Sequence, residues 1–433
     1  MHKWSVLLWS LLLCVPAGLT GEPANQHAGV VVRAGRVLDV RSGAYRDHQM
    51  ILIEGDRIRE VGDERELLPH VPSDARVVDL SRYTVLPGLI DAHTHLTGSP
   101  YLMGYRGLAV SVPREALLGA RNARVTLEAG FTTVRNVGAS GFADIALRDA
   151  INAGDVPGPR ILASGPPLGI TGGHCDENLL APEFHFFSEG VANGVPAVMA
   201  KVREDIKYGA DLIKFCATGG VLSKGDNAEF EQYSPEEMQA IVREAHRLGR
   251  KVAAHAHGAR GIKDAVLAGV DSIEHGSYIT DEGIAAMKKH GTYLVPTLYL
   301  EDWMVQNGNL PPYSHQKMVA ISAVAKQNIK RAMEAGVKIA MGTDAAVYPH
   351  GLNAHELDVY VNQLGMAPLA ALQSATMNAA DLMGWTAKTG SLDPGKWADI
   401  IAVEKNPLDD VRVLQNVKFV MKAGVVYKSE AKQ

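Results

Sequence analysis

The stretch Val85-Leu86-Pro87-Gly88-Leu89-Ile90-Asp91-Ala92-His93-Thr94-His95 is an apolar run that ends in two histidines. Residues two apart in a strand point to the same side, so this run predicts a strand that presents both imidazoles together. Further β-branched apolar runs follow, most of them separated by helical patterns, at 131–137, 160–163, 212–217, 251–257, 272–275, 293–297 and 338–343. Eight strands alternating with helices predict an α/β fold, a (β/α)8 TIM barrel.

The segment from Ser234 to Gly249 illustrates the helical patterns between the strands. Ser234 is suited to cap a helix, Pro235 fits its first turn, and Glu237 completes a capping box. Gly249 is suited to end the helix. The alternative to a barrel is an open doubly wound sheet, but no dinucleotide-binding glycine pattern follows an early strand. The eight strands and the missing glycine pattern favour the barrel.

The two ends of the chain have a different sequence pattern from the middle. Short β-rich runs separated by turn residues occur throughout 29–85, and similar runs occur at 399–403, 417–421 and 425–427. We therefore expect one small β-sandwich domain built from both chain ends. The predicted boundaries are 28–86 and 388–428 for the two parts of that domain and 87–387 for the barrel.

The composition is that of a globular protein with a substantial core. Of the 433 residues 46% are hydrophobic and 21% are charged, which disfavours disorder and fibrous folds. The formal net charge is −5 and no long basic run occurs, so nucleic acid is not expected as a partner. Three cysteines are too few for a disulfide framework.

The first 21 residues predict a secretory signal peptide: a short basic start, an apolar run and small residues near 17–21. A membrane anchor is the alternative, although the apolar run is short for a bilayer. We therefore expect a secreted or periplasmic protein without stable membrane insertion after the signal is removed. Removal takes Cys14 with it and leaves Cys175 and Cys216, which could pair or stay free.

Polar residues stand at the ends of five predicted strands, where a barrel places its reacting groups. They are His93 and His95 on the first, Lys214 on the fourth, His255 and His257 on the fifth, His275 on the sixth and Asp344 on the eighth. Each alone could be an ordinary hydrogen-bonded residue at a strand end. Together they predict a metal site, because imidazole and carboxylate groups are metal ligands. A buried lysine also needs a partner, a shifted pKa or a modification.

The motif Asp91-Ala92-His93-Thr94-His95, the lone Lys214, the separate histidines and the late Thr343-Asp344 resemble the amidohydrolase superfamily. The run 85–91 and the tail motif Gly390-Ser391-Leu392-Asp393-Pro394-Gly395-Lys396-Trp397-Ala398-Asp399 resemble the boundary signatures of that family. The resemblance covers nearly the whole chain after the predicted signal. Within the family the sequence is most similar to the branch of Xaa-Pro dipeptidases (prolidases), imidazolonepropionases and ochratoxin-hydrolysing amidohydrolases.

The resemblance implies a binuclear site with two divalent ions, expected to be zinc. It assigns His93, His95 and Asp344 to a buried ion, His255 and His275 to an exposed ion, and a carboxylated Lys214 to both. It implies attack by a metal-bridging hydroxide with Asp344 as general base and then general acid. It also assigns contacts with the substrate carbonyl or α-carboxylate to His174 and Tyr233. His257 is expected in a substrate or supporting role, and loop or core packing is the alternative for these three residues.

We therefore expect a metal-dependent hydrolase of amide or peptide bonds in small substrates with a free carboxylate. Such substrates are dipeptides such as Xaa-Pro, N-acyl amino acids and ochratoxin-like aryl amides. One alternative is hydrolysis of a cyclic amide, as in imidazolonepropionase, and predicted export argues against it. Another alternative is a non-catalytic barrel that binds a ligand. Relatives in this branch also imply a homo-oligomer, with an octamer as one candidate.

Overall fold

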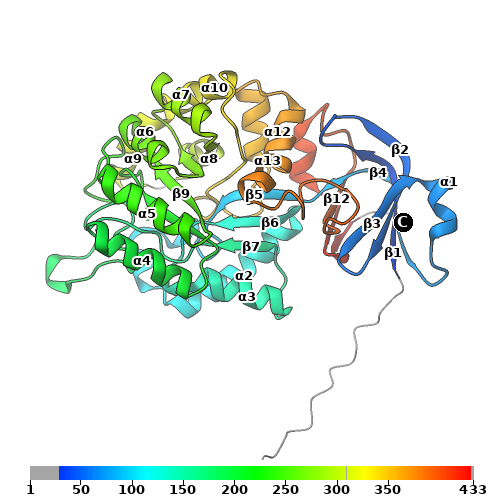
Figure 1. The fold of residues 1–433 in the computed structure, drawn as a ribbon, viewed down its shortest axis with the longest axis horizontal. Coiled ribbons are helices and arrows are strands. Elements are labelled where there is room, and N and C mark those ends of the chain that lie inside the picture. The colour runs from blue at the N-terminus through cyan, green and yellow to red at the C-terminus, as the bar shows by residue number, and fades with distance from the viewer. Residues whose placement is uncertain (1–28, 309, 431–433) are drawn as a thin grey trace, which may run out of the picture.

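The computed structural model describes residues 29–308 and 310–430. A barrel with its helices forms one body, and strands from both chain ends form a second body beside it (Figure 1). The predicted signal peptide, 1–21, lies outside the described residues. No helix in the described ranges is both long and apolar enough to cross a bilayer.

Parallel strands form most of the barrel. One set is β5 (Leu89–Thr94), β6 (Phe131–Asn136) and β7 (Arg160–Ala163). The other set is β8 (Leu212–Cys216), β9 (Lys251–Ala256), β10 (Ser272–His275) and β11 (Tyr293–Val295). Each lies within one of the predicted runs. The prediction of a barrel is confirmed.

The eighth predicted strand, 338–343, closes the barrel although its pairing is too irregular to form a long ladder. Leu294 pairs with Ile339 on one side of this segment, and Thr94 pairs with Ala345 on the other. The closing backbone bonds run from Leu294 N–H to Lys338 O, Ala340 N–H to Leu294 O, Ala92 N–H to Met341 O, and both Thr343 N–H and Asp344 N–H to His93 O. Between β7 and β8, Asp211 N–H donates to Ala163 O, and Leu168 pairs with Phe215.

Helices surround the barrel and connect its strands (Figure 1). The longer ones are α2 (Val112–Glu128), α3 (Ala143–Ala153), α4 (Val195–Lys207), α5 (Pro235–Arg247), α6 (Ala259–Ala268), α7 (Asp281–His290), α8 (Tyr299–Asn307), α9 (Pro312–Ser322) and α10 (Ala325–Glu334). Shorter ones are α11 (His355–Asp358), α12 (Pro368–Ser374), α13 (Met377–Leu382) and, outside the barrel, α1 (Glu64–Leu67). The buried faces of the longer helices and most of the barrel strands share one large apolar core.

The second domain is a seven-stranded mixed sheet in the order β14-β13-β12-β4-β1-β2-β3. Its strands are β1 (Val30–Leu38), β2 (Tyr45–Glu54), β3 (Arg57–Asp63), β4 (Arg76–Pro87), β12 (Ile400–Val403), β13 (Phe419–Lys422) and β14 (Val425–Ser429). Ile51 and Ile58 from one half share a buried core with Ile400 and Phe419 from the other, so the sheet curves around that core. The expected β-domain from both chain ends is confirmed, and its layers belong to one continuous sheet. Its exact boundaries stay predictions.

The predicted first barrel run is divided between the two domains at Gly88. β4 ends at Pro87 in the chain-end sheet, and β5 begins at Leu89 in the barrel. A Cβ atom on Gly88 would lie 2.1 Å from Thr132 Oγ1 on β6, so only glycine fits at this crossing point. Hydrophobicity alone does not mark such a break.

Helix α5 begins as the sequence predicts. Ser234 Oγ accepts the backbone N–H of Glu237, and the Glu237 carboxylate accepts the backbone N–H of Ser234. This capping box satisfies two backbone donors that the helix itself leaves unpaired. The helix ends at Arg247, and Gly249 follows with a left-handed φ of 72°.

Replacing Ser234 by alanine removes one half of the capping box. We expect Ser234→Ala to lower the free energy of unfolding by about 1 kcal/mol, because one backbone N–H loses its side-chain acceptor. Ser234→Asp keeps an acceptor and is the matched control, with stability close to wild type. Thermal and urea midpoints of the three proteins measure the effect. Equal midpoints for wild type and Ser234→Ala would contradict it.

Candidate metal-dependent active site

His93, His95 and Asp344 meet at the mouth of the barrel. His93 lies on β5, His95 follows it, and Asp344 follows the segment that closes the barrel. His93 Nε2 lies 3.4 Å and His95 Nε2 3.2 Å from Asp344 Oδ1. Two imidazoles and a carboxylate this close form a donor set that suits a divalent ion.

His255, His257 and His275 form a second cluster across the barrel mouth, with possible ligand atoms within 4.8 Å of one another. The ring centroids of His93 and His275 are 5.0 Å apart, so the two clusters adjoin. Lys214, on β8, lines the same cavity as both clusters. The structure thus brings all six predicted ligands to one cavity, and it adds His257 to the second cluster.

Hydrogen bonds fix which nitrogen of His93 and His95 is free. His93 Nδ1 lies 2.8 Å from Glu274 Oε2. His95 Nδ1 lies 3.1 Å from Gly138 O. A carboxylate and a carbonyl accept hydrogen bonds only, so each Nδ1 carries the proton and each Nε2 offers a lone pair. By the same argument His255 Nε2, 3.1 Å from Gly219 O, carries a proton and leaves Nδ1 free. These are the tautomers that metal-binding histidines need.

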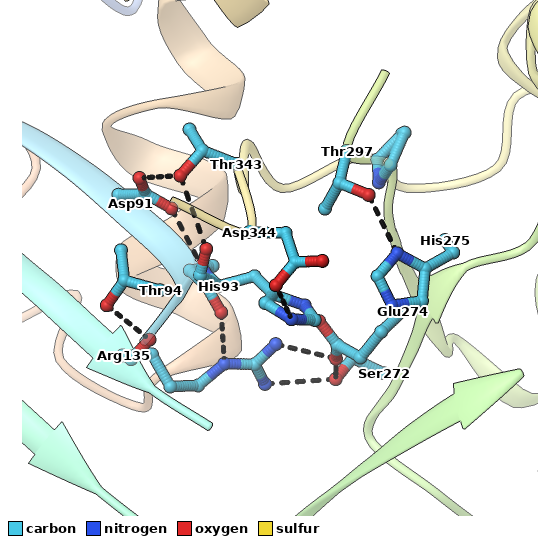
Figure 2. Close-up of polar contacts among 12 residues, drawn as sticks. Asp91, His93, Thr94, Arg135, Ser272, Glu274, His275, Thr297, Thr343 and Asp344 are labelled. Carbon is cyan, nitrogen blue, oxygen red and sulfur yellow. Dashed lines mark hydrogen bonds and ion pairs between the residues drawn. The ribbon is translucent and has the colours of Figure 1, made fainter. Parts of the chain in front are cut away.

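A buried ion pair supports His93 from below. Glu274 accepts from Arg135 Nη2 at 2.7 Å and from Ser272 Oγ at 2.5 Å, and all three are nearly inaccessible to solvent (Figure 2). Burial alone would raise the pKa of Glu274, but the Arg135 charge and the His93 bond hold this pKa at about 2. Sequence reasoning missed both charged residues. The available signal was a charged residue inside an apolar strand, in β6 for Arg135 and in β10 for Glu274.

Two of the predicted ligands have unusual backbone geometry. His275 has φ of 67° and Asp344 has φ of 58°, in the left-handed region that residues other than glycine seldom adopt. Such positions cost on the order of 1–3 kcal/mol each and cluster at functional sites. Although burial raises the pKa of the Asp344 carboxyl, His93 and His95 lower it well below its ordinary range. The carboxylate form is therefore strongly favoured.

Asp91 ties the first strand to the closing segment. Its carboxylate accepts from Thr343 Oγ1 at 2.6 Å, from Asn353 Nδ2 at 2.8 Å and from the backbone N–H of His93 at 3.1 Å. Burial raises the pKa of Asp91 to about 6. These bonds hold the residue before Asp344 beside the strand that carries His93 (Figure 2).

The clusters open into a cavity of about 300 Å³, large enough for a small organic molecule. The polar groups in its lining are His93, His95, His174, Lys214, His255, His257, His275 and Asp344. The lining also includes the Cys175–Cys216 disulfide and the apolar residues Met103, Val137, Pro167, Val221, Leu222, Leu300, Met318, Ala346 and Val347. An apolar substrate group can therefore lie beside the metal-binding side chains.

His174 lines this cavity and stacks on His255, with ring centroids 4.2 Å apart. Its Nδ1 lies 2.8 Å from Ser223 Oγ, which donates its one proton to the Asp226 carboxylate at 2.7 Å. Ser223 must therefore accept from His174 Nδ1–H, and the neutral ring has no second N–H to donate. Burial lowers the pKa of His174 to about 4, which favours that neutral form. In this form its Nε2 is an acceptor, and the expected contact between His174 and the substrate stays a prediction.

Tyr233 is not among the residues that line the cavity. Its side chain is fully buried, and its hydroxyl donates to Ala192 O at 3.0 Å. Packing explains this residue, and its position does not support the expected substrate contact. The long loop after β7 also carries Phe184, Phe186 and Phe187, whose side chains are exposed and form no wall of the cavity.

Cys175 and Cys216, whose state the sequence left open, form a disulfide with Cα atoms 6.1 Å apart. Cys175 follows His174 on the long loop, and Cys216 lies two residues after Lys214 on β8. The bond joins the loop to the strand at the cavity wall. It therefore limits how far His174 can move from the site.

Removing the carboxylate charge beneath His93 tests the supporting network. We expect Glu274→Gln to weaken divalent-ion binding about 10- to 100-fold, because one amide oxygen cannot accept both from His93 and from the Arg135–Ser272 side, and the charge that fixes the His93 tautomer is lost. Metal competition against a chelator, followed by elemental analysis, measures this change. Glu244→Gln is the control, since Glu244 is also a buried acceptor for arginine but lies on α5, away from the cavity. Unchanged metal affinity in Glu274→Gln would contradict the inferred role.

The model of the Amidohydrolase family matches residues 84–427. Ochratoxinase from Aspergillus niger is 38% identical over 367 residues, which are 79% of this chain and 75% of that enzyme. Imidazolonepropionase from Fusobacterium nucleatum is 29% identical over 81% of this chain and 83% of that enzyme.

Among solved structures, a Xaa-Pro dipeptidase with methionine bound in its active site superposes with a TM-score of 0.86 and 39% sequence identity. The match covers 93% of this chain and all of the dipeptidase chain. The extent of these matches and the paired donor clusters lead to one conclusion. The chain belongs to the amidohydrolase family and is a metal-dependent amidohydrolase.

Proposed function

We propose that this enzyme hydrolyses the amide bond of small substrates that carry a free carboxylate. Dipeptides of the Xaa-Pro type are the foremost class, followed by N-acyl amino acids and ochratoxin-like aryl amides. The observation that carries the proposal is the meeting of two donor clusters at one cavity of about 300 Å³ whose lining also includes many apolar side chains. That arrangement suits a substrate with a scissile carbonyl next to an apolar group.

Two divalent ions, in our proposal zinc, would be held by residues that already present suitable lone pairs. His93, His95 and Asp344 would hold one, and His255 and His275 the other. Bound divalent ions supply Lewis acidity, which polarises a carbonyl and lowers the pKa of water. The free nitrogens of His93, His95 and His255 support this assignment.

Lys214 is proposed to carry a carboxyl group derived from CO2 and to contribute an oxygen to each ion. Burial lowers the pKa of the Lys214 amine to about 8, which makes its neutral, nucleophilic form more accessible. An ammonium between two dications would be strongly repelled, whereas a carbamate adds negative charge there. Metal binding and modification of Lys214 should therefore depend on each other.

Asp344 is proposed to move the proton. Its carboxylate lies beside both His93 and His95, where it can accept a proton from an attacking water and pass it to the leaving amine. His174 is the competing proton acceptor, because its Nδ1–H is held by Ser223 and its Nε2 keeps a lone pair in the same cavity. His257 lines the cavity with Nδ1 paired to Ser277 Oγ at 2.8 Å, which leaves it as a candidate contact for the substrate carboxylate.

The relatives support amide chemistry and differ in substrate. The names of two of them refer to ochratoxin and to Xaa-Pro dipeptides, and both proteins are more than a third identical to this chain over the matched region. The similarity to imidazolonepropionase favours a cyclic amide as the second candidate. A panel of substrates separates these classes.

We also propose that the enzyme acts outside the cytoplasm as a homo-oligomer. The apolar sequence before residue 21 and the Cys175–Cys216 disulfide support an oxidising compartment. Oligomerisation rests on the family resemblance alone. Locating the mature protein in cell fractions and measuring its mass in solution test the two points.

The substrate proposal is tested with purified, zinc-loaded enzyme and four substrate types: Xaa-Pro dipeptides, N-acyl amino acids, an aryl amide of phenylalanine and imidazolone propionate. We expect hydrolysis of the first class, about two ions per chain by elemental analysis, and loss of turnover after chelation. Turnover of imidazolone propionate alone would favour the second candidate. Full activity in protein shown to be free of metal would reject both.

Asp344→Asn tests the proton transfer. We expect kcat to fall by about 10²- to 10⁴-fold, because an amide of the same shape cannot accept the proton. The fold should remain intact, since asparagine tolerates the left-handed backbone at this position. His174→Asn is the comparison variant, and both are assayed at measured, equal metal content. Near-normal kcat in Asp344→Asn with a collapse in His174→Asn would assign the proton to His174 instead.

A further inference from the structure

A second, smaller cavity adjoins the main one and contains an acid that the proposed chemistry does not use. It has room for about 20 Å³ and shares Val221, His257, His275, Leu300 and Met318 with the lining of the main cavity. Glu301, in the first turn of α8, also lines it. The smaller cavity is therefore a narrow side chamber next to the metal-binding histidines.

Glu301 is buried without a partner for one of its oxygens. The residue is only 5% exposed, and Glu301 Oε2 has no hydrogen-bond partner among the described residues. The nearby Lys326 is paired with Asp302 instead. A buried carboxyl oxygen without a hydrogen-bond partner lowers the stability of the fold, so a bound water or ligand is expected to satisfy it.

Hydroxyl groups complete the polar side of this chamber. Ser277 Oγ lies 2.8 Å from His257 Nδ1, and Thr297 Oγ1 lies 2.7 Å from His275 Nδ1. Both residues line the chamber with Glu301, and each hydroxyl oxygen has a second lone pair for a further donor. Three acceptor groups around so small a space match the three N–H groups of a primary ammonium.

We propose that this chamber binds the α-ammonium group of the substrate, with Glu301 as its counter-ion. The inference rests on the proposed amide hydrolysis and narrows it to substrates with a free amine beside the scissile carbonyl. In a dipeptide the ammonium is bonded to the carbon next to that carbonyl. The ammonium of a bound dipeptide must therefore lie close to the metal-binding side chains. The chamber meets this condition, because His275 lines both the chamber and the main cavity.

Size and charge both favour an ammonium. A space of about 20 Å³ holds one water-sized group, and an ammonium is of that size. A cation near two divalent ions needs a carboxylate to offset their repulsion, and no described lysine or arginine lines the chamber to neutralise Glu301 first. Burial raises the pKa of Glu301 to about 8, so an arriving cation would also stabilise its charged form.

The test compares two substrates that differ only in the amine: leucyl-proline and 4-methylpentanoyl-proline. For Glu301→Gln we expect KM for leucyl-proline to rise about 10- to 100-fold, the usual range for losing a charged hydrogen-bond partner. The KM for the desamino substrate should not change. Glu301→Asp, which keeps the charge on a shorter arm, should lie between Glu301→Gln and wild type.

Glu356→Gln is the matched control. Glu356, on α11, is also buried, and its carboxylate accepts the backbone N–H groups of Leu298 and Tyr299 at the start of α8, but it does not line either cavity. We expect it to leave the ratio of the two KM values unchanged. Equal effects of Glu301→Gln on both substrates, or no effect on either, would overturn the proposal in favour of a bound water.

Calorimetry separates this inference from the proposed function. Zinc-loaded enzyme is titrated with leucine and with 4-methylpentanoate, neither of which requires turnover. Weaker leucine binding in Glu301→Gln, with unchanged binding of 4-methylpentanoate, supports the ammonium site even if no dipeptide is hydrolysed. If leucyl-proline is hydrolysed but wild type and Glu301→Gln bind leucine with equal affinity, the proposed function is retained and the ammonium site is rejected.

Discussion

The hydrogen bonds between β5 and the closing segment hold both the barrel and its site together. The backbone N–H groups of Thr343 and Asp344 both donate to His93 O, and Ala92 N–H donates to Met341 O. The same contact that closes the ring of strands thus sets the Asp344 carboxylate beside His93 and His95. The same hydrogen bonds therefore close the barrel and assemble one donor cluster.

That coupling explains why much of the site could be predicted. Parallel strands bring their carboxyl ends to one rim, so polar residues that end separate strands must meet there. The strand pattern and this rule placed the polar strand-end residues at one rim, and the family resemblance then selected six of them as ligands. The eighth strand was found although its pairing is irregular, because its apolar run and its terminal Asp344 are both visible in the sequence.

Other features depend on contacts that no local pattern reports. Gly88 divides an apparently continuous run because Thr132, on a neighbouring strand, leaves no room for a Cβ atom. Tyr233 stands close in sequence to a site loop, but its hydroxyl is used by Ala192 O. The pairing of Cys175 with Cys216 likewise depends on how the loop after β7 folds onto β8.

The interior below the donor clusters is unusually polar for a barrel core. Arg135, Glu274 and Ser272 form a buried network, and Arg135 Nε also donates to Ala92 O at 2.5 Å. A buried ion pair seldom improves stability over apolar packing. Its value here lies in geometry, because it fixes the His93 ring from the side opposite the cavity. Apolar packing could fill the same space but could not accept the hydrogen bond from His93 Nδ1–H.

The chain-end sheet can be completed only late in synthesis, because two distant parts of the chain form it. β4 lies at its centre and pairs with β1 on one side and with β12 on the other. On a ribosome, which delivers the amino end first, the four N-terminal strands must wait for nearly the entire barrel to emerge before β12 arrives. Until then the edge of β4 that later pairs with β12 has unpaired backbone groups, and an unpaired strand edge is prone to aggregation. The nascent protein is therefore at its most vulnerable just before its last thirty or so residues appear.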